Sequence, residues 1–181
     1  MRILFVLPAY EPAWAFGGVV RCISNICREL AAQGHSVSVY TTNANGMGRA
    51  LDVPLGVLVD LGRVKVYYFP STFGPRRVWD SRAIVRKLKQ SAKQYDIVYV
   101  SAVWQWLGYE TTIICQKAGV PCVFGIHGSL DSRLLRRHRF RKRLYWWLIL
   151  RQTLSKASAI HFTTEYERSE SIQTGVASFV V

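Results

Sequence analysis

The sequence has no apolar run that approaches the roughly 20 residues a membrane-spanning helix needs. Its N-terminal apolar stretch is too short for the core of a signal peptide, and Pro8 interrupts it. The 4 cysteines form no C-x-x-C pair, which favours small, buried, reduced side chains over metal ligands or disulfides. These absences predict a globular protein made and kept in the cytosol.

The usual catalytic and cofactor signatures are also absent. Acidic residues number only 11, and no pair of them has the arrangement that glycoside hydrolysis requires. Glu165 and Glu167 open a predicted helix, where acids interact favourably with the helix dipole. Neither the G-x-S-x-G turn of serine hydrolases nor the G-x-G-x-x-G dinucleotide fingerprint occurs. We therefore expect neither a hydrolase nor a dinucleotide cofactor.

Apolar runs alternate with amphipathic segments along the whole chain. We expect strands at 3–7, 36–42, 64–69, 96–101, 121–126, 159–163 and 178–181, and helices at 19–30, 80–94, 107–118, 134–157 and 165–173. Residues 43–62 predict a loop with at most a short strand near 57–59. This alternation predicts an α/β fold, a Rossmann-like doubly wound parallel sheet with helices on both faces. Residues 1–181 form a single domain that stops inside an apolar strand, so we expect more protein to follow.

Candidate ligand-binding residues follow the predicted strands, where open α/β sheets bind ligands. Gly17 and Gly18 begin a helix, so an anion could approach bare backbone N–H groups there. His127 directly follows a buried strand. Alternatively, Gly17 and Gly18 form only a tight turn, and His127 has only a structural role. Further candidates for a ligand wall, each equally consistent with core packing, are Trp14, Phe16, Trp104 and Trp106.

Positive charge is concentrated in one segment of a chain whose net charge is +13. It contains no acid and consists of Arg133, Arg136, Arg137, Arg139, Arg141, Lys142 and Arg143. A solvated helix face, nucleic acid or an anionic membrane surface could each accommodate it. Aromatic residues follow the segment without alternating with its charges, which disfavours nucleic acid. Each cation near an anionic leaflet contributes about 1 kcal/mol. The cations point all round a helix, however, so no clean amphipathic membrane helix results.

Taken in order, these segments resemble the N-terminal half of GT-B glycosyltransferases of family 4, which are retaining enzymes. The resemblance rests on Phe16 to Gly18, Leu30 to Val37, His127 to Asp131, Lys142 to Trp146 and Ala157 to Glu167. Family members often carry histidines in the strand corresponding to 96–103, where this chain has Tyr99 and Ser101.

The resemblance implies transfer of a sugar from a nucleotide-sugar donor to a sugar or lipid-linked acceptor, in bacterial polysaccharide or glycolipid assembly. It places Gly17 and Gly18 at the donor diphosphate and His127, as the catalytic residue, beside the donor sugar. Trp14, Phe16, Trp104 and Asp131 become candidates for acceptor binding. A C-terminal nucleotide-sugar-binding domain lies outside 1–181, so we expect this half alone to be inactive.

The family also implies that no metal is needed. We expect a cytoplasmic location, at the inner face of the membrane if the segment 133–143 holds the domain there, and no nucleic-acid partner. The alternative hypothesis is a non-catalytic module that uses residues 133–143 to bind a membrane or a partner protein.

Overall fold

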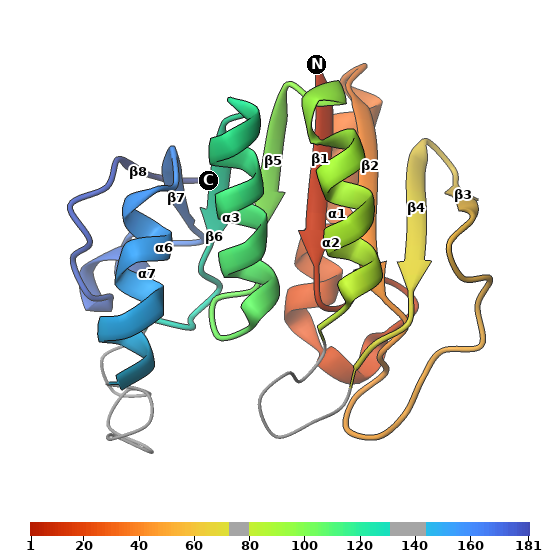
Figure 1. Cartoon of the computed structure of the whole chain (residues 1–181), viewed down its shortest axis with the longest axis horizontal. Coiled ribbons are helices and arrows are strands. Elements are labelled where there is room, and N and C mark those ends of the chain that lie inside the picture. The colour runs from red at the N-terminus through yellow and green to blue at the C-terminus, as the bar shows by residue number, and fades with distance from the viewer. Residues whose placement is uncertain (73–79, 131–143) are drawn as a thin grey trace.

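A computed structural model describes residues 1–72, 80–130 and 144–181, which fold around one eight-stranded sheet (Figure 1). The strand order is β3-β4-β2-β1-β5-β6-β7-β8. The strands are β1 (Arg2–Leu7), β2 (Ser36–Thr42), β3 (Leu58–Leu61), β4 (Val64–Phe69), β5 (Ile97–Val100), β6 (Cys122–Gly125), β7 (Ala159–Phe162) and β8 (Ser178–Val180). The helices are α1 (Gly18–Ala32), α2 (Arg82–Ser91), α3 (Trp106–Ala118), α6 (Arg151–Ser155) and α7 (Glu165–Glu170), with short turns η1 (Trp14–Phe16), η2 (Ala92–Gln94) and η3 (Trp146–Leu150).

The strand order reverses between β1 and β5. The chain leaves β1 towards β2 and β4 on one side, then returns through α2 to β5 and continues to β6, β7 and β8 on the other side. The loops after β1 and β5 therefore diverge at the carboxyl edge of the sheet. Such a reversal opens a crevice in which α/β proteins bind ligands.

Alternate residues of the strands enter two separate cores, as expected for a sheet covered on both faces. Leu4 and Val6 of β1 pack in the core formed with α2, α3 and α6, which cover the face turned to the viewer in Figure 1. Ile3, Phe5 and Leu7 pack against α1 on the opposite face. The predicted doubly wound architecture is confirmed.

One expectation about the sheet needs correction, because it is not wholly parallel. β3 pairs with β4 in antiparallel fashion at the edge of the sheet, from Leu58 opposite Tyr67 to Leu61 opposite Val64. The short strand expected near 57–59 is thus a four-residue edge strand whose residues are half-buried or exposed. A short antiparallel edge strand is common in such sheets.

The other differences concern helix ends and one cysteine. The helix expected at 134–157 is described from residue 144 onward, where a π-helical turn precedes α6, and α6 ends at Ser155. The helix expected at 165–173 ends at Glu170. Cys27, Cys115 and Cys122 are buried as expected, but Cys22 is exposed.

Candidate functional site

A cleft of about 170 Å³ lies at the carboxyl edge of the sheet, where the strand order reverses. The loop after β1, the start of α1, the loop after β5 and the turn after β6 all contribute to its walls. The side chains that matter most below are Phe16, Val19, Ser101, Trp104, His127 and Ser129. The cleft is therefore lined by His127 and by Phe16 and Val19, the residues on either side of the Gly17-Gly18 turn.

The N-terminus of α1 is bare at this cleft. Gly17 adopts φ +71° and Gly18 begins the helix, and no side chain caps it. The left-handed backbone explains the glycine at position 17. Position 18 has an ordinary φ and open space around its missing side chain, so protein packing does not require glycine there. The first N–H groups of a 15-residue helix and its positive dipole end thus form a potential anion site.

His127 occupies an unusual backbone conformation immediately after β6. Its φ is +47°, and Gly128 follows at +77°, so two successive left-handed residues turn the chain back beneath the strand end. A non-glycine residue with positive φ is uncommon and needs support from its surroundings. Two hydrogen bonds support this turn. The Ser129 N–H donates to the Ile126 carbonyl oxygen, and the Gly128 N–H donates to the Glu167 carboxylate.

The His127 ring is linked to a second histidine through a tyrosine. The hydroxyl of Tyr99 on β5 lies 2.9 Å from His127 Nε2 and 2.9 Å from His161 Nδ1 on β7. Gly125 on β6 makes this possible, because a Cβ there would stand only 1.9 Å from the Tyr99 hydroxyl oxygen. Strand register explains the arrangement: Tyr99 is opposite Val123, and Gly125, two residues further on, is opposite His161.

Burial keeps this cluster uncharged at neutral pH. Desolvation, helped by the neighbouring His161, lowers the pKa of His127 to about 4, although the Glu167 carboxylate partly opposes the shift. Burial likewise lowers the pKa of His161 and raises that of Tyr99 far above its ordinary value. At pH 7 both imidazoles are therefore neutral hydrogen-bonding groups and poor carriers of positive charge.

Glu167, in the first turn of α7, ties the His127 turn to β7. Its Oε1 accepts from Gly128 N, and its Oε2 accepts from Thr163 N at 2.6 Å and from Thr163 Oγ1 at 2.7 Å. Burial raises the pKa of this carboxyl, but these hydrogen bonds outweigh it and leave the pKa below its ordinary value. The interpretation of Glu167 as a helix-dipole residue was incomplete, since it also holds the turn that carries His127.

Tyr99, His161 and Glu167 were missed as site residues because their partners lie on other strands. Tyr99 and His161 each fit an ordinary strand pattern, and nothing in a linear pattern shows which residues of different strands are opposite each other. The available signal was Gly125: a glycine inside a buried strand often marks a close approach by another group.

The other predicted residues divide between the cleft and elsewhere. Trp104 lines the cleft, and its Nε1 donates to Ser129 O at 3.1 Å, while Phe16 lines the opposite side. Trp14 is 45% exposed and borders a separate depression with Glu11 and Arg28. Trp106 begins α3 and packs edge-on against Tyr109. Asp131 and the basic residues Arg133, Arg136, Arg137, Arg139, Arg141, Lys142 and Arg143 lie outside the described residues.

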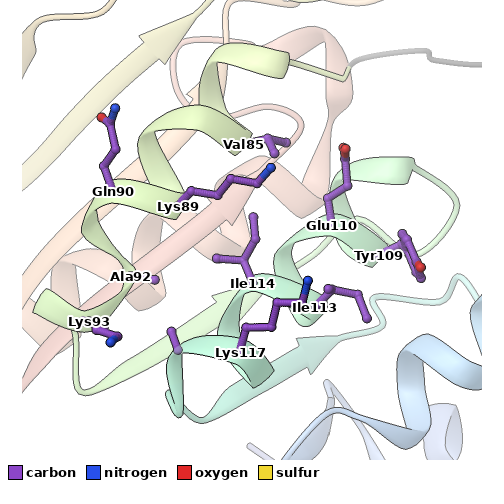
Figure 2. Close-up of a pocket in the computed structure, with 11 residues that line it drawn as sticks. Val85, Lys89, Gln90, Ala92, Lys93, Tyr109, Glu110, Ile113, Ile114 and Lys117 are labelled. Carbon is purple, nitrogen blue, oxygen red and sulfur yellow. The ribbon is translucent and has the colours of Figure 1, made fainter.

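A larger groove, of about 410 Å³, lies between α2 and α3 on the face opposite α1 (Figure 2). Its floor is apolar, with Val85, Ile113 and Ile114, and the ammonium groups of Lys89 and Lys117 project over it. It contains no imidazole, thiol or bare helix N-terminus. The smaller cleft at His127 differs from this groove in having a half-buried imidazole close to a helix N-terminus.

Two features are absent from the described part of the chain. No helix there is both long and apolar enough to cross a membrane. No three side chains of the His, Cys, Asp and Glu types gather there as a metal site would require.

Comparison with known proteins places this geometry in context. A family model described as "Glycosyl transferase 4-like domain" matches residues 17–179. Among solved structures, HepE from Anabaena in complex with UDP-glucose superposes with a TM-score of 0.58 at 18% identity, covering 100% of this chain and 43% of HepE. UDP-GlcNAc 2-epimerase from Methanocaldococcus jannaschii superposes with a TM-score of 0.56 at 15% identity, covering 100% of this chain and 45% of the epimerase.

UDP-GlcNAc 2-epimerase from Neisseria meningitidis bound to UDP-GlcNAc superposes with a TM-score of 0.52 at 14% identity, covering 99% of this chain and 46% of the epimerase. No protein with a curated function matches the sequence. These structural likenesses establish the fold, and this chain spans less than half the length of each structure.

Proposed function

The chain belongs to the glycosyl transferase 4-like domain family and has the fold of an N-terminal GT-B domain, and from this premise we propose that it contributes one wall of a sugar-transfer site. The reaction proposed is transfer from a nucleotide-sugar donor to a sugar or lipid-linked acceptor, with retention of anomeric configuration. Its setting would be the assembly of bacterial surface polysaccharide or glycolipid.

The observation that carries the proposal is the meeting of two chemically suitable groups at one cleft. The bare N-terminus of α1 suits a diphosphate, because it offers free N–H groups and a positive dipole end. His127 on the same cleft is neutral and offers a ring nitrogen to a sugar oxygen. A ligand with a diphosphate beside a sugar matches this pair, and HepE was crystallised with such a molecule, UDP-glucose.

The remaining cleft residues suggest how an acceptor is placed. Trp104 is fixed by its hydrogen bond to Ser129 O, and Phe16 faces the cleft from the turn before α1. Rigid aromatic surfaces of this kind suit the apolar face of a sugar ring. We propose that Phe16 and Trp104 form this wall and that Trp14 extends the acceptor surface outside the cleft. We also propose that Asp131, which lies outside the described residues, binds the acceptor.

A second domain would supply the rest of the site. This chain covers 43% to 46% of the superposed structures. In our proposal, the groups that bind the nucleotide therefore belong to a C-terminal half. Cations of that half and the α1 dipole would stabilise the leaving diphosphate without a metal. The 181-residue chain alone would then be catalytically silent.

The test uses the enzyme in which this domain is joined to its nucleotide-sugar-binding half. We expect His127→Gly, chosen because glycine accepts the left-handed backbone, to lower kcat by about 10- to 100-fold with a smaller change in donor KM. His35→Ala, in the turn between α1 and β2 and away from the cleft, is the matched control and should retain activity. Unchanged kcat in the His127 variant would remove it from the site. Epimerisation of a nucleotide sugar without transfer would reject the transferase reaction.

The basic segment supports a second element of the proposal, membrane contact. It carries Arg133, Arg136, Arg137, Arg139, Arg141, Lys142 and Arg143 without an intervening acid. We propose that it holds the domain at an anionic leaflet where lipid-linked acceptors lie. Flotation with anionic liposomes should recover the protein, and neutral liposomes should not. Binding that ignores lipid charge but saturates with RNA would contradict this.

A further inference from the structure

The Tyr99 hydroxyl has one proton to share between two imidazoles. It lies 2.9 Å from His127 Nε2 and 2.9 Å from His161 Nδ1, and all three side chains are largely removed from solvent. A phenolic hydroxyl can donate one hydrogen bond and accept others. The protonation of the two facing ring nitrogens must therefore be complementary: one ring donates to Tyr99 and the other accepts from it.

Two neutral arrangements satisfy this condition. In the first, His161 Nδ1–H donates to Tyr99, Tyr99 donates to His127 Nε2, and the His127 proton resides on Nδ1. In the second, the chain runs in the opposite direction, and the His161 proton resides on Nε2. Any other neutral combination either places two lone pairs opposite each other or leaves the buried hydroxyl proton without an acceptor, and both are unfavourable.

The environment of His161 distinguishes the two arrangements. His161 Nε2 is buried and has no hydrogen-bond partner among the described residues. The neighbouring Val181 backbone favours a protonated ring, but it does not reach hydrogen-bond geometry with Nε2. The second arrangement would leave a buried N–H without an acceptor there, whereas the first leaves only a lone pair. Phe179 stacks on the His161 ring at 5.2 Å and keeps water from that side.

We propose that Tyr99 and His161 are positioning residues that fix neutral His127 in the tautomer with its proton on Nδ1. His127 Nε2 is committed to Tyr99, and Nδ1 bonds to no residue that the structure describes, which leaves it for a ligand in the cleft. His127 then acts as a hydrogen-bond donor towards an acceptor oxygen of the ligand, and not as a base. The inference deepens the proposed function, since it assigns the direction of one hydrogen bond in that site.

The charged groups around the cluster are compatible with this direction. Glu167 is the carboxylate that influences both imidazoles, but its oxygens are already engaged by Gly128 and Thr163. It therefore fixes the turn without competing for a ring proton. After burial, the neighbouring Cys22 and Cys27 of α1 and Glu167 also raise the pKa of Tyr99, so the Tyr99 hydroxyl keeps its proton.

Two-bond ¹H–¹⁵N correlation spectra of the 181-residue chain, with ¹⁵N-labelled histidine at pH 7, test the proposal without catalysis. We expect a protonated Nδ1 and an unprotonated Nε2 for both His127 and His161. Tyr99→Phe should shift His127 towards the Nε2–H form that predominates in free histidine. Tyr95→Phe, which removes a hydroxyl bonded to Tyr40 in the other core, should leave both tautomers unchanged.

Substitutions of His161 provide a second, independent comparison. His161→Asn can place an amide N–H near the position of Nδ1 and should preserve the His127 tautomer, whereas His161→Leu should lose it. An Nε2–H tautomer of His127 in the unsubstituted chain, or a tautomer unchanged in both Tyr99→Phe and His161→Leu, would overturn the proposal. A sugar-transfer assay that fails would leave these spectra unaffected, so the two failures are distinguishable.

Discussion

At the scale of single residues, the site depends on the absence of one side chain. Gly125 leaves room for the Tyr99 hydroxyl, which would otherwise stand 1.9 Å from a Cβ atom. We expect Gly125→Ala to lower the free energy of unfolding by about 1–3 kcal/mol, because buried groups must move to relieve the overlap. It should also disturb the His127 and His161 ring resonances.

Urea unfolding measures the stability change, and Gly18→Ala is the matched control, since its added Cβ meets nothing within 4 Å. Equal stabilities of the two variants would show that the Tyr99 ring does not depend on this space.

The buried imidazoles predict a dependence of stability on pH. Burial lowers the pKa of His127 from its ordinary value of 6.5 to about 4, so between these two pH values the unfolded chain binds a proton that the folded chain excludes. Stability should therefore fall as the pH drops below 6.5. At pH 5 the loss from His127 alone is about 2 kcal/mol.

Urea unfolding of the chain at pH 7 and pH 5 measures this loss. His127→Asn, which tolerates the left-handed backbone, should reduce it, and the part due to His161 should remain. A pH dependence identical in the variant would place the responsible groups elsewhere.

At the scale of elements, the two glycines that open α1 have separable roles. Gly17 has φ +71°, so Gly17→Ala should destabilise the fold by about 1–2 kcal/mol. Gly18 has an ordinary φ, so Gly18→Ala should leave stability nearly unchanged while its methyl group narrows the approach to the helix N-terminus. Thermal unfolding and titration with inorganic pyrophosphate separate the two effects. Weaker stability in Gly18→Ala with unchanged anion binding would contradict this division.

Most elements could be predicted from sequence because apolar residues run continuously through β1 and begin β2 and β4 at every second position. β1, β2 and β4 lie in the expected places for that reason. The short strand expected near 57–59 corresponds to β3, but its antiparallel direction could not be predicted, because a linear pattern does not show which strands pair. The π-helical turn at Trp146–Leu150 could not be distinguished from the α-helix expected there, because its residues are all apolar.

The candidate site was only half predictable by the same physical reasoning. Gly17, Gly18 and His127 are adjacent to strand or helix ends, which a linear pattern reveals. Tyr99 and His161 meet because β5, β6 and β7 pair in a particular register. That register is set by the packing of the whole sheet and is not visible in a linear pattern.

At the scale of the whole molecule, the strand order explains why distant segments meet. The reversal between β1 and β5 opens the carboxyl edge, and the turn after β6 brings His127 to the same edge. The superposed structures are more than twice as long as this chain, and in our proposal a second domain completes the cleft.

The central claim is that the start of α1 and the turn at His127 bind one ligand, a nucleotide sugar. Amide chemical-shift mapping of the 181-residue chain with millimolar UDP-glucose tests it most directly. We predict that the resonances of Gly17, Gly18 and Gly128 shift together along one saturating curve. Shifts confined to the groove between α2 and α3, around Lys89 and Lys117, would contradict it.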